Sequence, residues 1–398
     1  MTTNPVQLDE ESEVDTRVTL LLADHRPAEL SPAEFFGAQF DAGLAWVHFP
    51  KGCGGLGLNR RLQALVQNRI KAEGGPSPYR NFIGYGMAAP TLLEHGTDSQ
   101  LDRLLRPLFT GEEVWCQLFS EPGAGSDVAA LATRAVRDGG QWTVSGQKVW
   151  TTLAHVSRWG MLLARTDPEQ PKHKGLTFFV IDLDRPGVEV RPLRQLTGEA
   201  EFNEVYLDGA VIPDSFRVGQ VGDGWKVALT TLMSERVTLG GDGTPRRRSI
   251  DDVVELLLSS SPTSSVSAVA RDRAMTTWID SQVLDLVARR AAAGRAAGSP
   301  GPEGAVGKLG KAEQEQRIRS LHLDLLGSEA MMYDTYAMTR PTHAMAFGSP
   351  QQAFLRSLAT TIEGGTSEIM RNILGERVLG LPSEPRLDRG PWNQVPRS

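Results

Sequence analysis

The stretch WCQLFSEPGAGSDVAALATRA (Trp115–Ala135), followed after a short turn by WTVSGQKVWTTLA (Trp142–Ala154), decides the fold. It combines short β-rich runs with a loop of little side-chain bulk. The loop and the second run supply a set of small hydroxyl and backbone donors: Ser120, Gly123, Gly125, Ser126 and Thr152. Such donors suit a ligand rich in oxygens and ring nitrogens, and Trp150 offers a flat surface for a planar ring. An ordinary turn between strands beside a core tryptophan fits the same composition.

The segments on either side of this stretch have a different character. Residues 30–108 show helical spacing, as in RLQALVQNRIKAE, whereas residues 115–218 contain short β-rich runs separated by Gly, Pro and Asp at intervals of about ten residues. Helical patterns return from Gly222, including one over 308–334. We therefore predict an α+β protein with a helical domain over 1–114, a β sandwich or barrel over 115–221 and a helical domain over 222–398. Ser259–Ser267 and Gly294–Gly307 are expected to be mobile surface connections.

Composition excludes several classes of function. The chain has 398 residues, 40% of them hydrophobic, and a net charge of -6 with no basic run longer than three residues, which argues against nucleic acid as a partner. No apolar run reaches the roughly 20 residues that span a bilayer, and the acidic start is unlike a secretion signal, so we expect a cytoplasmic protein without a membrane span. Cys53 and Cys116 are expected to be reduced, packed thiols.

Several common motifs are missing. GAGSDV has two glycines of a dinucleotide fingerprint, but Val128 stands where the third belongs. The seven histidines are scattered without metal-ligand spacing, so no metal site is expected. No serine lies in a G-x-S-x-G elbow.

The motifs SEPGAGSD, SGQK, VWTT and GGTSEIMRNILGERVLGLP closely resemble those of the acyl-CoA dehydrogenase family, as do GGLGLN, LLEHGTDSQ and FNEVYLDGAVIPD. The resemblance extends from Ala33 to Pro382. It implies an N-terminal helical domain, a central β-barrel or sandwich and a C-terminal four-helix bundle. It further implies FAD, an acyl-CoA substrate, an electron-transfer flavoprotein-type acceptor, a homo-oligomer or heteromer, and a place in lipid metabolism such as fatty acid or steroid degradation.

The resemblance also assigns roles to individual residues. Phe119 and Ser120 would lie along the flavin ring, and Ser126 near the pyrophosphate and the bound thioester. Trp150 would pack on the ring system and Thr152 would lie near the flavin N5. Three further residues complete this set: Thr366 and Glu368, which match positions on the adenosine side of the cofactor, and Arg236, which matches an arginine supporting the catalytic region.

The reaction of the family needs a carboxylate that removes the α proton while the β hydrogen leaves as hydride to flavin N5. Many members place that carboxylate directly before the GT of the C-terminal motif, where this chain has Gly364. Glu363 lies one residue earlier, and a shift of one residue in a turn redirects a side chain. The long-chain and isovaleryl branches instead carry a glutamate before an arginine on an earlier helix, which matches Glu235 and Arg236. We therefore predict Glu235 as the base, with Glu363 as the second candidate and Gly364 in the substrate wall.

The chain departs from the family pattern at a cofactor contact between subunits. Arg271 and Gln282 keep the spacing of that motif, but Ala274 and Met275 replace its phenylalanine and glycine. Either the chain binds FAD with an altered site, or a different dehydrogenase subunit completes it. The same fold would also suit an acyl-CoA oxidase, a flavoenzyme acting on a carrier-bound acyl group, or a non-catalytic subunit of a heteromeric dehydrogenase.

Overall fold

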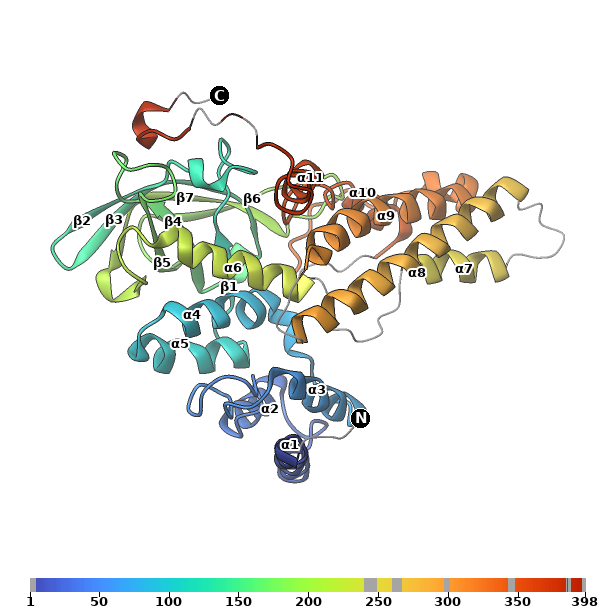
Figure 1. Ribbon diagram of the computed structural model, residues 1–398, viewed down its shortest axis with the longest axis horizontal. Coiled ribbons are helices and arrows are strands. Elements are labelled where there is room, and N and C mark those ends of the chain that lie inside the picture. The colour runs from blue at the N-terminus through green and yellow to red at the C-terminus, as the bar shows by residue number, and fades with distance from the viewer. Residues whose placement is uncertain are drawn as a thin grey trace.

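The computed structural model in Figure 1 shows helices below and beside a central sheet. It describes residues 5–239, 249–259, 267–296, 301–342, 348–383, 385 and 388–395. The side chains at 5–8, 79–80, 235–239 and 295–296 lie outside that description.

The N-terminal region is helical. Its α-helices are α1 (Pro5–Asp24), α2 (Pro32–Asp41), α3 (Gln63–Ala72), α4 (Ala89–His95) and α5 (Asp98–Thr110), with a π-helical turn at Gly84–Ala88 and 3₁₀ turns at Arg60–Leu62 and Pro78–Asn81. Capping boxes begin two of them, since Ser31 pairs with Glu34 before α2 and Thr97 with Gln100 before α5. These capping residues explain why α2 begins at Pro32 and α5 begins at Asp98.

The central region is one eight-stranded sheet. Its strands are β1 (Trp115–Leu118), β2 (Arg134–Asp138), β3 (Gln141–Thr152), β4 (Trp159–Arg165), β5 (Leu176–Asp182), β6 (Val188–Pro192), β7 (Phe202–Pro213) and β8 (Arg217–Val218). The order is β6-β7-β3-β2-β4-β5-β8, and β1 pairs in parallel with β4. Strand β4 is buried along its whole length, so it is covered on both faces.

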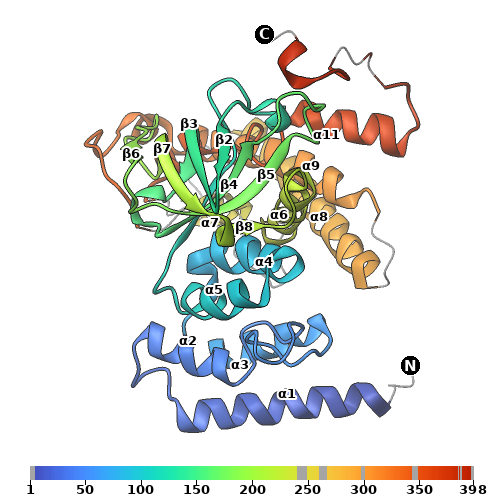
Figure 2. The same cartoon turned by 90° about the vertical axis from the view of Figure 1, so that its left-hand side faces the viewer.

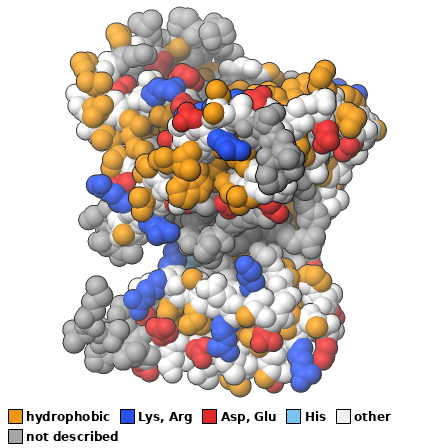
Figure 3. Space-filling view, turned by 90° about the vertical axis from the view of Figure 1, so that its right-hand side faces the viewer, with side chains coloured by type: hydrophobic (Ala, Val, Ile, Leu, Met, Phe, Trp, Pro, Cys, Tyr) orange, Lys and Arg blue, Asp and Glu red, His pale blue; other side chains and the backbone are white. Residues whose placement is uncertain are grey.

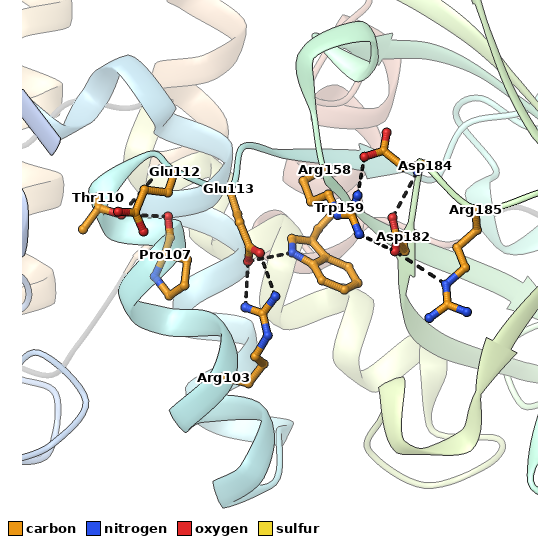
Figure 4. A network of polar contacts seen from close by, with 10 residues as sticks. All are labelled: Arg103, Pro107, Thr110, Glu112, Glu113, Arg158, Trp159, Asp182, Asp184 and Arg185. Atoms are coloured by element: carbon orange, nitrogen blue, oxygen red, sulfur yellow. Dashed lines mark hydrogen bonds and ion pairs between the residues drawn. The ribbon is translucent and has the colours of Figure 1, made fainter.

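A polar network fixes the end of α5 against the sheet (Figure 4). Glu113 accepts two hydrogen bonds from Arg103, at 2.7 and 2.9 Å, and one from Trp159 Nε1 at 2.8 Å. Burial opposes the charge of Glu113, but Arg103 outweighs it, and the pKa of this carboxyl is lowered. On the far side of Trp159, Arg158 pairs with Asp182 at 2.7 Å. The network therefore joins the N-terminal helices to strands β4 and β5.

The C-terminal region is again helical. Its α-helices are α6 (Gly224–Leu239), α7 (Ser249–Ser259), α8 (Ala268–Ala296), α9 (Glu303–Leu326), α10 (Pro350–Ser357) and α11 (Ser367–Ile373), followed by a π-helical turn at Leu374–Val378 and a 3₁₀ turn at Trp392–Gln394. Figures 1 and 2 place α6 between the sheet and α4. The predicted order of helical, β and helical regions is confirmed; the exact domain limits stay a prediction. No helix in the described part of the chain has the length and apolar character that crossing a membrane requires.

Two sequence expectations were wrong in detail. The helix expected over 308–334 ends at Leu326, because Gly327 adopts φ 60° and the chain then makes a 3₁₀ turn and becomes extended. The connection expected over Gly294–Gly307 is partly helical, since α8 reaches Ala296 and α9 begins at Glu303. Most of the other expected connection, residues 260–266, lies outside the described residues.

Candidate active site

Two segments that are distant in the sequence meet where β1 and β3 end. The backbone N–H of Val149 donates to the carbonyl of Ser120 at 2.9 Å. Phe119 beside it is buried and packs edge-on against Phe178, with ring centroids 5.9 Å apart. The start of the glycine-containing loop is therefore fixed to the residue that precedes Trp150.

A buried ion pair attaches this loop to strand β3. The Glu121 carboxylate accepts hydrogen bonds from Lys148 Nζ at 2.8 Å, Ala132 N–H at 2.7 Å and Thr133 N–H at 2.9 Å. Lys148 also donates to the Phe119 carbonyl at 3.0 Å. Burial disfavours the charged form of both side chains. For Glu121 the ammonium of Lys148 outweighs burial, so the pKa of the carboxyl is lowered. For Lys148 burial outweighs the attraction of Glu121, so the pKa of the amine is lowered as well.

Neither member of this pair was predicted from the sequence. A signal was present, because Lys148 is in phase with the inward-facing Trp142 and Val144 along β3. A lysine at an inward position needs an anionic partner, and Glu121 supplies it from the loop.

Trp150 is held outward by irregular backbone. The β3–β7 register shifts between Lys148 and Thr151, and Trp150 adopts φ 57°, which is unusual for a bulky residue. Its side chain is 58% exposed and packs edge-on against Phe202, with ring centroids 5.8 Å apart. Thr152 lies opposite Phe202 in the ladder and is half-buried. Strained backbone that exposes an indole is typical of a ligand-binding site.

The C-terminal motif reaches the same place through a buried arginine. Arg356 is 8% exposed and lies over the Phe202 ring, with Cζ 5.6 Å from the centroid. It donates to both oxygens of Glu363, at 2.8 and 3.1 Å, and its Nε lies 3.6 Å from the Glu201 carboxylate. The indole of Trp150 and the carboxylate of Glu363 are therefore linked through two intervening side chains, Phe202 and Arg356.

The glycines after Glu363 turn the chain into α11. Gly364 and Gly365 have φ values of 62° and 96°, so an L side chain at either would be strained. Thr366 caps α11 by accepting a hydrogen bond from the Ile369 N–H at 3.1 Å. Glu368 is exposed and lies 3.6 Å from Arg371, toward solvent. Thr366 and the two glycines thus follow directly after Glu363, which Arg356 connects to Phe202 and the Trp150 region, and Glu368 is exposed beyond them.

The remaining predicted site residues lie on helices α6 and α8. Glu235 and Arg236 belong to the last turns of α6, and their side chains lie outside the described residues. Earlier on α6, Leu229 and Met233 are 42% and 65% exposed, so that this face of the helix is apolar and accessible. Helix α8, which carries the exposed Arg271 and the half-buried Gln282, lies beside the sheet in Figure 1, with its first turns farthest from it. The structure does not bring these two residues to the Trp150 region of this chain.

The assembled groups fit FAD. An exposed indole offers a stacking face, and Ser120, Ser126 and Thr152, none of them fully buried, carry hydroxyls on the loop and strand that meet next to it. A Cβ added at Gly123 or Gly125 would meet no atom within 4 Å, which leaves room above the loop for a bulky ligand. A flat ring system joined to phosphates matches this combination of a planar surface, small donors and open backbone.

Comparison with known proteins agrees along the chain. Sequence models of the acyl-CoA dehydrogenase N-terminal, middle and C-terminal domains match residues 12–112, 116–210 and 222–379. Among curated proteins of Mycobacterium tuberculosis, acyl-CoA dehydrogenase FadE34 is 39% identical over 86% of this chain and 45% of its own length. Acyl-CoA dehydrogenase IpdE1 is 38% identical over 87% of this chain and 86% of its own. The chain thus spans about half of the first relative and most of the second.

Two solved structures are similar over their whole length. A variant of the Tcur3481-Tcur3483 steroid ACAD superposes with a TM-score of 0.72 at 25% identity, covering 96% of this chain and 100% of that one. The ChsE4-ChsE5 complex of Mycobacterium tuberculosis gives 0.71 at 25% identity, with the same coverage. The predicted fold class is confirmed, and the chain belongs to the acyl-CoA dehydrogenase family.

Proposed function

We propose that this chain catalyses FAD-dependent α,β-dehydrogenation of an acyl-CoA thioester to the trans-2-enoyl-CoA. The observation that carries the proposal is the meeting of both family motifs through Trp150, Phe202 and Arg356. The two motifs are about 200 residues apart in a sequence of 398, so their convergence is a property of the fold.

The residues proposed to hold FAD are those to which the family resemblance assigns that role. They are Phe119, Ser120, Ser126, Trp150, Thr152, Thr366 and Glu368, with Arg271 and Gln282 proposed to act across a subunit interface. FAD, when bound, supplies the hydride acceptor that the reaction needs. Ser126 and Gly364 are proposed to line the substrate side, and Arg236 to support the catalytic region.

We propose Glu235 as the base that removes the α proton. Gly364 has no side chain, and both oxygens of Glu363 are hydrogen-bonded by Arg356, which leaves the earlier position on α6 as the better candidate. Leu232, three residues earlier on α6, is half-buried and lies on the same face of the helix as position 235, so it provides an apolar neighbour for the proposed base.

The substrate is proposed to be a bulky, steroid-derived acyl-CoA, because a similar solved structure is described as a steroid ACAD. Electrons would pass to an electron-transfer flavoprotein-type acceptor. An anaerobic test uses purified holoprotein and a panel of straight-chain, branched and steroid-derived CoA esters, with flavin absorbance as the readout. Bleaching by steroid-derived esters is expected; bleaching only by short straight-chain esters would refute the substrate class.

Two variants test the base. Glu235→Gln should retain FAD and lose substrate-induced bleaching, since the amide cannot take a proton. Glu363→Gln should still bleach. The reverse pattern would make Glu363 the base, and bleaching at the wild-type rate in both would remove each from the reaction.

A second candidate is a subunit that needs a different dehydrogenase chain to complete its cofactor site. Helix α8 carries an exposed apolar face formed by Met275, Ile279, Val283 and Leu286, at 58%, 49%, 52% and 61% exposure. Figure 3 shows hydrophobic side chains gathered on the side occupied by the C-terminal helices. If the chain alone bound stoichiometric FAD and turned over substrate, the obligate partner would be refuted. Oxygen consumption without an added acceptor would instead indicate an oxidase.

A further inference from the structure

The end of the chain is attached to the sheet beside the glycine-containing loop. We call Asp388–Val395 the Trp392 strap. The N–H of Trp392 donates to the Gln170 carbonyl at 2.9 Å, and the N–H of Asn393 donates to the Pro168 carbonyl at 3.0 Å. In Figure 1 this segment, at the red end of the colour scale, turns back over the sheet. Backbone hydrogen bonds therefore hold the strap in one place on the β region.

The Trp392 side chain contacts the loop directly. Its Nε1–H donates to the Ala130 carbonyl at 3.0 Å. Its ring lies over the Arg165 guanidinium, with Cζ 4.5 Å from the centroid. Arg165 is 1% exposed and itself donates to the Ala129 carbonyl at 2.6 Å. The indole thus covers the buried cation that holds the same turn of the loop.

A second tie lies three residues earlier in the loop. Lys172 Nζ pairs with Asp127 at 2.6 Å and also pairs with Asp388 of the strap. The lysine side chain is 12% exposed, whereas Asp127 is 55% and Asp388 28% exposed, so these contacts are partly shielded from water. Asp127 and Ala130 bracket the 3₁₀ turn Val128–Ala130, and Ser126 directly precedes it. The strap is consequently tied to both ends of this turn.

We propose that the Trp392 strap positions residues 126–131 of the loop for ligand binding, with Trp392 as the positioning residue. This inference rests on the proposed function, in which Ser126 lies near the phosphates of FAD. Ordering a loop on ligand binding costs backbone conformational entropy, which weakens binding. A loop that the strap already orders in the free protein avoids this penalty when the ligand binds.

The test compares Trp392→Ala, which removes the ring and the N–H donor, with Trp392→Phe, which keeps a ring over Arg165. Amide hydrogen exchange of residues 126–131 and FAD binding to the apoprotein are measured for each. In Trp392→Ala we expect faster exchange and a dissociation constant for FAD raised about tenfold. Trp392→Phe should fall between. In a substrate titration with saturating FAD, kcat should stay within about twofold of wild type. The KM for the acyl-CoA substrate should rise, as when binding that is equal in the ground state and the transition state is lost.

The matched control is Tyr206→Ala. Tyr206 lies over Arg191, with Cζ 4.4 Å from the ring centroid, and accepts a hydrogen bond from Gln147, so the same two kinds of contact are lost elsewhere on the sheet. Unchanged exchange and FAD affinity in Trp392→Ala would overturn the inference, as would an equal effect of Tyr206→Ala. A wild-type chain that bound no FAD on its own would instead refute the first proposed function and favour the second candidate, while faster exchange in Trp392→Ala would still support the strap.

Discussion

Neutralising Glu121 should destabilise the protein far more than neutralising an exposed glutamate. In Glu121→Gln, Lys148 stays buried at 0% exposure with its charge uncompensated, and one of the two backbone N–H groups now bound by the carboxylate loses its acceptor. Removing one partner of a buried ion pair lowers the free energy of unfolding by about 3–5 kcal/mol. Since native domains are stable by about 5–15 kcal/mol, this loss is a large fraction of the total.

The assay is urea-induced unfolding followed by circular dichroism at pH 7. Glu189→Gln is the control, because Glu189 and its partner Arg191 are both more than half exposed and their pairing should not measurably change the urea midpoint. Adding Lys148→Met to Glu121→Gln should restore part of the loss, because the buried charge is then gone. A loss below about 1 kcal/mol in Glu121→Gln, or equal losses in the two glutamine variants, would refute the reasoning.

Three further outcomes are expected. Burial lowers the pKa of His48 to about 4 from 6.5, so the unfolded chain takes up this proton first as the pH falls. The contribution of His48 to the free energy of unfolding is therefore full above pH 6.5 and decreases as the pH drops toward 4. His48→Gln should flatten this part of a plot of unfolding free energy against pH. Hydrogen bonds, the largest contribution coming from Arg217, lower the pKa of Asp214 to about 2 from 3.8, so the ionised carboxylate stabilises the fold above pH 3.8. Asp214→Asn should lower the free energy of unfolding above pH 3.8. It should also make the decrease of that free energy between pH 3.8 and pH 2 smaller than in the wild type. A Cβ at Gly55 would lie 2.1 Å from a backbone carbonyl oxygen, so Gly55→Ala should lower the melting temperature strongly, whereas Gly140→Ala, with open space, should not.

The sequence was most informative where structure is set by neighbouring residues. The helix at Gln63–Ala72 was predictable because the apolar residues of RLQALVQNRIKAE recur at helical spacing. The exposed surface of Trp150 was predictable from its motif, although its positive φ was not. Even the burial of Lys148 is readable from strand alternation.

What the sequence could not provide were partners brought together by packing. Arg356 and Glu201 are 155 positions apart, and Trp392 and Ala130 are 262 apart. No periodicity relates such positions, because their proximity depends on how whole elements pack against one another. The contact of Arg356 with Glu201 and the strap beside the loop therefore became visible only in the folded chain.

This distinction bears most directly on Glu363. Viewed along the sequence, a glutamate beside two glycines resembles a mobile catalytic group, but in the fold Arg356 donates to both of its oxygens. The same guanidinium is 8% exposed, lies over Phe202 and approaches Glu201, so releasing Glu363 would leave a buried cation with one distant partner. A general base must present an oxygen to the substrate, and here that would require breaking this arrangement. We infer that Glu363 secures the turn which carries Gly364 and Gly365, and that the proton-abstracting carboxylate approaches from α6.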